Sequence, residues 1–264
     1  MLPHSTTPHA HVHGAGPALL LAHGAGGSFD DNFGGLVGEL RHRRTLLGRD
    51  YPGSGSRPVA GAPLQLDDLA DELVDTAVSH GLSHFPVLGL SLGSAVAITA
   101  ALRHPDRVSA LVLTVGFPRG DSQLTTFAEQ YAVLAADGRV DALARMLVLA
   151  ESPAVLADRD EQTRSEVLDA MAAGLQQTAA LRAPQMELAP RVDLTDRLPG
   201  ISVPTLVIAA GQDRIVLPGS TRDLARGIPE AELVELPGAG HIFTAPEVVE
   251  WAALVAAFLD RHGV

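Results

Sequence analysis

The chain contains no cysteine, which excludes disulfides, thiolate catalysis and metal sites with cysteine ligands. It also lacks a cluster of basic residues: 19 arginines, with no lysine, are scattered among 31 aspartates and glutamates, giving a net charge of −12. Nucleic acids and anionic membranes are bound through a basic face. We therefore expect neither of them as a partner.

The first apolar run is short. Ala18–Ala22 is too short for a signal-peptide core or a membrane span, and no basic residue precedes it. On these grounds we expect a soluble, cytoplasmic protein.

Hydrophobic residues make up 46% of the 264 positions, enough to bury a full core. Short, nearly continuous apolar runs alternate with helical patterns, which is typical of central parallel strands covered on both faces. The sequence predicts strands at 17–22, 45–47, 85–90, 108–115, 204–209 and 233–236, and helices at 30–40, 66–80, 92–104, 217–227 and 246–262. This alternation predicts an α/β fold with a mostly parallel, doubly wound sheet.

The alternation is interrupted between residues 121 and 196, where only helical patterns occur. They cover 124–136, 140–149, 163–177 and 181–188, with prolines between and within them. An all-helical block between two strands of a parallel sheet predicts a lid. We expect one domain over 1–264, with a core at 15–120 and 197–264 and a helical cap at 121–196.

The pentapeptide Gly89-Leu-Ser-Leu-Gly93 lies between a predicted strand and a predicted helix. A serine on so tight a turn is forced out of regular structure, and the flanking glycines remove side chains that would collide there. By itself the pattern is weak evidence. A serine hydroxyl also needs a base, and that base needs a group that orients it.

Two candidate partners follow later strands, where functional groups of parallel sheets gather. Asp213 comes after the strand at 204–209, and His241 comes after the strand at 233–236, within a loop that Gly238 and Gly240 allow to bend. Asp121, which follows the strand at 108–115, is the alternative acid. Two further acids, Asp193 and Asp196, are disfavoured because they precede a strand.

Donors for an oxyanion are predicted at two backbone positions. One is the N–H of Leu92, at the start of a helix. The other belongs to the glycine-rich loop 23–27, with Ala25 as the first choice and Gly26 as the second.

The side chains expected around a substrate are less specific. His23 is a candidate substrate contact, although bracing of the loop is the favoured role. Four apolar side chains could line the pocket or equally belong to the core: Phe29, Phe117, Phe127 and Met146.

Histidines alternate near the N-terminus at His9, His11 and His13. Imidazoles at every second residue of a strand share one face and could bind a metal ion. Because no acidic ligand is close in sequence, a solvated edge strand is the favoured interpretation, and no metal site is included in the prediction.

Taken together, the motifs resemble the α/β-hydrolase superfamily. They are His23-Gly24, Asp50-Tyr-Pro-Gly-Ser-Gly-Ser56, Gly89–Gly93, Gly211-Gln-Asp213 and Gly240-His241, and they extend over residues 15–262. The resemblance implies Ser91 as nucleophile, His241 as base and Asp213 as orienting acid. Members usually have two strands before the strand that leads to the oxyanion loop. With only 16 residues available here, one of the two is expected to be short or missing.

We expect a serine hydrolase of the carboxylesterase type (EC 3.1.1) that acts on a mostly apolar, small-to-medium acyl compound and needs no cofactor. A thioesterase is an alternative, supported by the likeness of the His23–Ser28 stretch to type II thioesterases. A C–C hydrolase, a perhydrolase and a lyase would use the same three residues, and a ligand receptor or cyclase would use only the pocket. The oligomeric state is left open.

Overall fold

The computed structural model describes residues 10–264, so His9, the first of the alternating histidines, lies outside the described residues. A seven-stranded sheet has the order β1-β3-β2-β4-β5-β6-β7, with β1 antiparallel to β3 and the remaining neighbours parallel. The strands are β1 Ala10–Gly14, β2 Ala18–Ala22, β3 Thr45–Arg49, β4 Phe85–Leu90, β5 Val108–Thr114, β6 Thr205–Ala210 and β7 Glu232–Leu236. Among the described residues, β1 alone precedes β2, in line with the expected shortening of the front.

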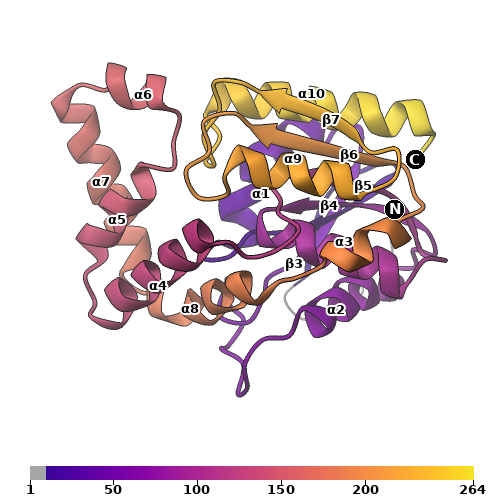
Figure 1. Ribbon diagram of the computed structural model, residues 1–264, viewed down its shortest axis with the longest axis horizontal. Helices are drawn as coiled ribbons and strands as arrows, with labels where there is room; N and C mark the ends of the chain where they lie inside the picture. The colour runs from indigo at the N-terminus through magenta and orange to yellow at the C-terminus, as the bar shows by residue number, and fades with distance from the viewer. Residues whose placement is uncertain (1–9) are drawn as a thin grey trace.

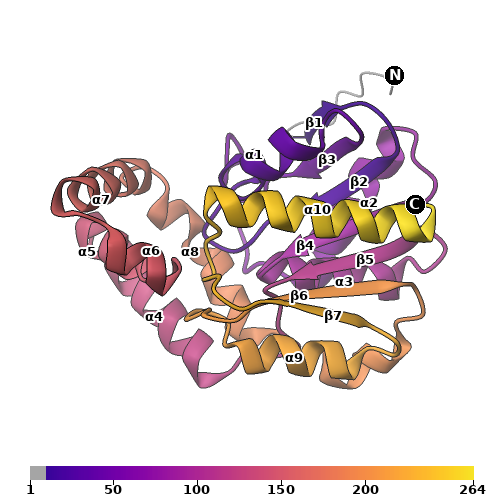
Figure 2. The same cartoon turned by 90° about the horizontal axis from the view of Figure 1, so that it is seen from above.

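Helices cover both faces of this sheet (Figures 1 and 2). They are α1 Phe29–Leu40, α2 Leu66–Ser79, α3 Leu92–Arg103, α9 Pro218–Gly227 and α10 Ala245–His262. Successive strand residues point to opposite faces. Leu20 packs in the cluster with α2, α3 and α9, whereas Leu21 packs in the cluster with α1 and α10. The doubly wound α/β architecture is therefore confirmed.

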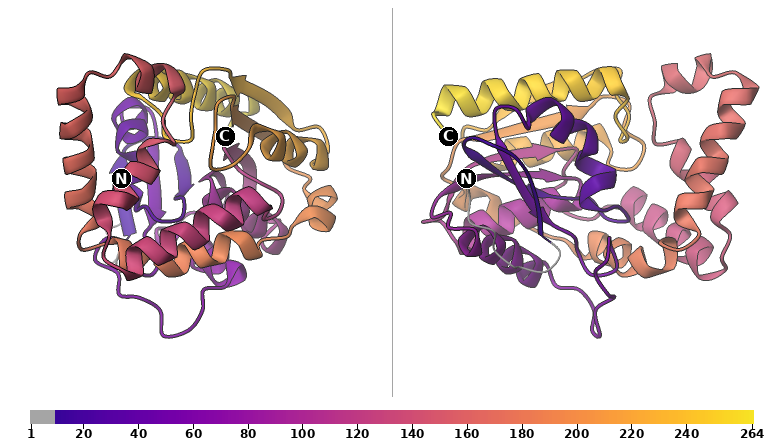
Figure 3. Two further views of the ribbon diagram at one scale, coloured as in Figure 1. Left: turned by 60° about the vertical axis from the view of Figure 1, so that its left-hand side comes forward. Right: turned by 180° about the vertical axis from the view of Figure 1, so that it is seen from behind.

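The segment between β5 and β6 is helical throughout its regular structure. It contains α4 Ser122–Ala136, α5 Val140–Val148, α6 Pro153–Asp158, α7 Glu161–Leu175, α8 Ala179–Leu188 and the 3₁₀ turns Ala189–Arg191 and Thr195–Gly200. Its helices share a hydrophobic cluster of their own, which includes Tyr131 and Leu143. In Figures 1 and 2, and in the right-hand view of Figure 3, α5, α6 and α7 lie to one side of the sheet.

Helix α6 lies between the helices predicted at 140–149 and 163–177, where the sequence indicates only a proline. That proline, Pro153, occupies the first turn of α6. A proline is tolerated there because the first backbone N–H groups of a helix have no partner within the helix. None of the described helices is both long and apolar enough to cross a bilayer.

Candidate active site

Ser91 lies between β4 and α3 with φ 54° and ψ −120°, in a region that few residues other than glycine adopt. Such a backbone costs roughly 1–3 kcal/mol and persists only where its surroundings impose it. Here the Ser91 N–H donates to the Thr114 carbonyl at 2.9 Å, which ties the turn to the end of β5. The residue retains slight exposure to solvent.

The glycines beside Ser91 are required by close packing. A Cβ on Gly89 would lie 2.2 Å from the Gly93 carbonyl oxygen, and one on Gly93 would lie 1.9 Å from the Ala22 carbonyl oxygen. Gly24, in the loop after β2, would place a Cβ 3.3 Å from the Ser91 Cβ. The turn is therefore pressed against the end of β2, beside the glycine-rich loop.

Asp213 and His241 are in direct contact. His241 Nδ1–H donates to Asp213 Oδ2 at 2.7 Å, and Asp213 is almost fully buried. The other carboxylate oxygen, Oδ1, accepts from the N–H groups of Ile215 at 2.8 Å and Val216 at 2.9 Å. These two bonds hold the carboxylate in place. Because an ionised carboxylate can only accept, its bond with His241 puts the imidazole proton on Nδ1. Nε2 is then left as the basic nitrogen.

The alternative acids either accept other hydrogen bonds or are exposed to solvent. Asp121 caps α4 by accepting from the Leu124 N–H at 2.8 Å. Asp193 accepts from the Thr195 N–H at 3.1 Å, and Asp196 is exposed within a 3₁₀ turn. Of the four acids considered, Asp213 is the one bonded to His241.

The loop that carries His241 contacts the helical insertion. The Ile242 N–H donates to the Ala150 carbonyl at 3.1 Å, and a Cβ on Gly240 would lie 2.4 Å from the same oxygen. A Cβ on Gly238 would have no neighbour within 4 Å, and neither glycine has a positive φ. Gly240 therefore allows a close approach of two backbones, whereas Gly238 lies in the turn that the Ala239 N–H closes onto the Leu236 carbonyl at 3.2 Å.

The glycine-rich loop has fewer free donors than predicted. The Gly24 N–H donates to Asn32 Oδ1 at 2.7 Å, and the Gly26 N–H donates to Gln185 Oε1 at 3.1 Å. Gly26 is therefore a wrong choice as a donor, because a side chain already occupies its N–H. Among the described residues, the Ala25 N–H has no protein acceptor.

Helix α8 holds this loop through two side chains that sequence reasoning missed. Gln185 is fully buried, and its amide nitrogen donates to the Pro52 carbonyl at 3.0 Å and to Ser54 Oγ at 2.8 Å. Arg182 donates to the Gly26 carbonyl at 3.2 Å and pairs with Asp31 at 2.8 Å. Gln185 and Gly26 are 159 residues apart, and no local pattern signals such a contact.

His23 braces the loop from within the core. Its Nδ1–H donates to the Gly24 carbonyl at 2.8 Å, and its Nε2 accepts from the Tyr51 N–H at 2.9 Å. Complete burial lowers the pKa of His23 to about 4, so the ring is neutral near pH 7. With both ring nitrogens used, His23 does not contact a substrate, which corrects that part of the prediction.

The four candidate pocket side chains lie in different places. Phe29 is fully buried on the α1/α10 face of the sheet, which corrects its assignment to a pocket. Phe117 is buried in the opposite cluster, and Met146 packs at the edge of the cluster within the helical insertion. Phe127 and Ala25 pack against both the sheet cluster that contains Phe117 and the cluster of the insertion, so they lie where the two meet.

One open hollow of the molecule lies away from these residues. A cavity of about 530 Å³ is lined by Arg49, Arg57, Leu64 and Glu72 among others, and its lining includes none of Ser91, Asp213 and His241. It lies between the loop after β3 and the start of α2, so we do not assign it to the candidate site.

Known proteins match the chain over almost its whole length. A family model described as alpha/beta hydrolase fold matches residues 17–245. The Pyrrolizixenacetamide deacetylase of Xenorhabdus hominickii is 31% identical over 256 residues, which are 96% of this chain and 94% of the relative. The pimeloyl-acyl-carrier-protein methyl ester esterase of Nitrosomonas europaea is 30% identical over 249 residues, covering 88% and 92%.

Solved structures agree on the fold. The enol-lactonase from Burkholderia xenovorans LB400 superposes with a TM-score of 0.82 at 24% identity, covering 96% of each chain. A thermophilic esterase from Thermogutta terrifontis superposes with a TM-score of 0.77 at 25% identity, covering 100% of this chain and 98% of that one.

Proposed function

Because this chain belongs to the alpha/beta hydrolase fold family and is a hydrolase, we propose that Ser91 attacks an acyl substrate with His241 as its base. The observation that carries the proposal is the 2.7 Å bond between His241 Nδ1 and Asp213 Oδ2. It holds the imidazole in the tautomer that leaves Nε2 free to take a proton. Ser91, Asp213 and His241 also follow strands β4, β6 and β7, whose carboxyl ends share one edge of the sheet.

In this mechanism His241 Nε2 accepts the Ser91 proton as the oxygen bonds to the substrate carbonyl carbon. The protonated imidazole then gives the proton to the leaving group, and the bond from carbon to the leaving group breaks. Water repeats the sequence on the acyl-enzyme and releases the acid. The backbone N–H groups of Leu92 and Ala25 stabilise the oxyanion. Removal of one such donor costs about 10²–10³-fold in kcat.

The substrate we propose is a small-to-medium, mostly apolar acyl compound. Ala25 and Phe127 form an apolar junction between the core and the cap, and the helices from 121 to 196 form a lid there. Asp213 stabilises the imidazolium that forms in each half-reaction, whichever leaving group is used.

An N-acyl amide is the second candidate for the bond that is broken. It is supported by the relative named a deacetylase, which is 31% identical along nearly the whole chain. Carboxylic ester hydrolysis stays the first proposal, supported by the relative named a methyl ester esterase.

The test is hydrolysis of matched p-nitrophenyl esters, p-nitroanilides and acyl thioesters of acetate, butyrate and octanoate. We expect ester turnover to be the fastest and the Ser91→Ala variant to lose at least 10³-fold in kcat/KM on every active substrate. If anilides are the best substrates, the chain is an amidase. Full activity of the Ser91→Ala variant would overturn the mechanism for all three bonds.

A further inference from the structure

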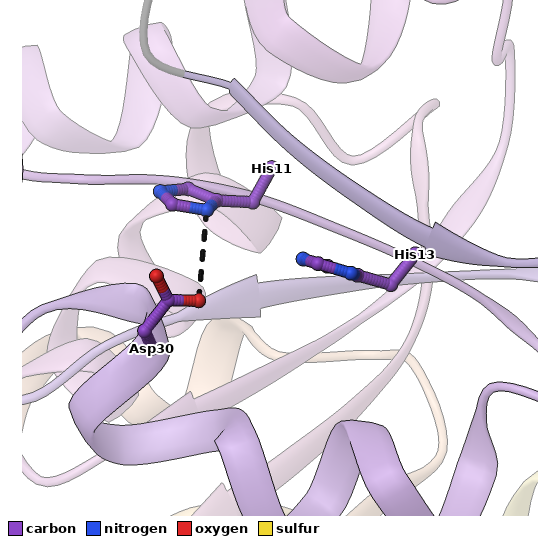
Figure 4. A group of neighbouring side chains, drawn as sticks. All are labelled: His11, His13 and Asp30. Carbon is purple, nitrogen blue, oxygen red and sulfur yellow. Dashed lines mark ion pairs between the residues drawn. The ribbon is translucent and has the colours of Figure 1, made fainter.

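Two histidines of strand β1, at one edge of the sheet, face the first turn of helix α1. His11 and His13 are two residues apart on the strand, so their side chains share one face. Asp30, the second residue of α1, lies opposite them. Figure 4 shows the two imidazoles and this carboxylate turned toward one another. The acidic ligand that is missing near these histidines in sequence is supplied by a different element.

The spacing of these groups suits a metal ion. One nitrogen of each imidazole and one oxygen of Asp30 all lie within 4.8 Å of one another. His11 Nδ1 and Asp30 Oδ1 are 3.8 Å apart. Ligands of a tetrahedral Zn²⁺ ion are separated by about 3.4 Å, given bonds of about 2.0–2.2 Å. Because the Asp30 side chain is 75% exposed, its rotation can close the remaining distance.

The imidazoles are also held in place before any ion binds. The rings of His11 and Phe29 stack with centroids 4.5 Å apart and planes 4° apart, and His13 stacks on the same Phe29 ring at 5.6 Å. This stacking keeps the two imidazoles nearly parallel.

A buried carboxylate orients His11 further. His11 Nε2–H donates to Asp50 Oδ2 at 2.9 Å, which leaves Nδ1 as the nitrogen directed at Asp30. Asp50 is itself fixed, because its Oδ1 accepts from the Phe29 N–H at 2.8 Å. A metal-binding histidine commonly donates its second N–H to a carboxylate in this way, which sets the tautomer and raises the basicity of the ligand.

We propose that His11, His13 and Asp30 bind a divalent transition-metal ion of the Zn²⁺ type. Two neutral imidazoles and one carboxylate are ligands that Zn²⁺ and its neighbours in the series prefer over Mg²⁺ or Ca²⁺. The bound ion crosslinks the edge strand β1 to helix α1. It therefore acts on the stability of this end of the sheet, and the chemistry at Ser91 does not depend on it.

The test uses the full chain without a histidine tag, stripped with a chelator and titrated with ZnCl₂ in a calorimeter. We expect one Zn²⁺ per chain, with affinity at least tenfold weaker in the His13→Ala and Asp30→Asn variants. His42→Ala, which removes an exposed histidine elsewhere, is the matched control and should bind as the parent does. Excess Zn²⁺ should raise the melting temperature of the parent and the control, but not that of the two ligand variants.

Two results would overturn the proposal. One is the absence of Zn²⁺ binding by the parent chain. The other is binding that both ligand substitutions leave unchanged, which would place the ion on other residues. Circular dichroism and ester hydrolysis, which neither substitution should alter, confirm that the variants are folded.

Discussion

Gln185, on helix α8, accepts a hydrogen bond from the Gly26 N–H, so a residue of the helical insertion holds the loop beside Ser91. The amide is buried and satisfied on both sides, because its nitrogen donates to the Pro52 carbonyl and to Ser54 Oγ. Packing of the insertion and the shape of the loop are therefore coupled. A change in the packing of the insertion should therefore alter the shape of the loop.

The Gln185→Ala variant should lose about 3 kcal/mol of unfolding free energy. The substitution leaves buried partners without hydrogen bonds and opens a cavity. Urea unfolding measures this loss, and kcat/KM for an ester should fall as the loop loosens. Gln162→Ala removes an amide that bonds Glu166 on an exposed helix face, and the stability of this variant should change by less than about 0.5 kcal/mol. Equal losses in the two variants would contradict the coupling.

The Asp213→Asn variant should keep its fold and lose about 10³–10⁴-fold in kcat. An asparagine oxygen can still accept from the Ile215 and Val216 N–H groups, but its amide no longer holds His241 in the required tautomer. Asp121→Asn is the control, since asparagine also caps helices well. Steady-state ester hydrolysis compares the two variants. A loss at Asp121 that matches the loss at Asp213 would show that the acid is wrongly assigned.

Gly240 and Gly238 lie in one loop but should respond differently to alanine. A Cβ on Gly240 meets the Ala150 carbonyl at 2.4 Å, whereas one on Gly238 meets nothing within 4 Å. Gly240→Ala should shift the loop that carries His241 and lower kcat/KM more than tenfold. Gly238→Ala should stay within twofold of the parent. Similar kinetics for both variants would argue against the close backbone contact.

Stability should depend on pH through His23. Burial lowers its pKa from 6.5 to about 4, so between these values the unfolded chain binds more protons than the folded one. The free energy of unfolding therefore falls as the pH drops through this window, by about 2.5 kcal/mol between pH 7.5 and pH 4.5. Urea unfolding at both pH values measures the decrease. In a His23→Gln variant, the unfolding free energy should fall by about 2.5 kcal/mol less than in the parent. An identical pH dependence in parent and variant would contradict it.

Local patterns predicted most of the fold because apolar runs and tight turns are properties of neighbouring residues. The Ser91 turn follows from Gly89 and Gly93, and the pairing of Asp213 with His241 follows from their places after parallel strands. Contacts between distant segments were not accessible. Nothing near Gly26 in sequence indicates that Gln185 occupies its N–H.

The face to which a residue points after a loop was equally hard to predict. Phe29 follows the glycine-rich loop closely but turns to the α1/α10 side of the sheet, where it stacks on His11. The sequence predicts that the segment from 121 to 196 is all-helical. The helix that begins at Pro153 was missed because a proline in the first turn looks, in sequence, like a proline that ends a helix.

Labelling with a fluorophosphonate probe shows directly whether Ser91 is the nucleophile. The active chain is treated with the probe, digested, and the adduct is located by tandem mass spectrometry, with Ser91→Ala as the control. We expect one adduct per chain on Ser91, loss of ester hydrolysis in step with labelling, and no adduct in the control. An active chain that takes up no probe, or carries it on another residue, would show that Ser91 is not the nucleophile.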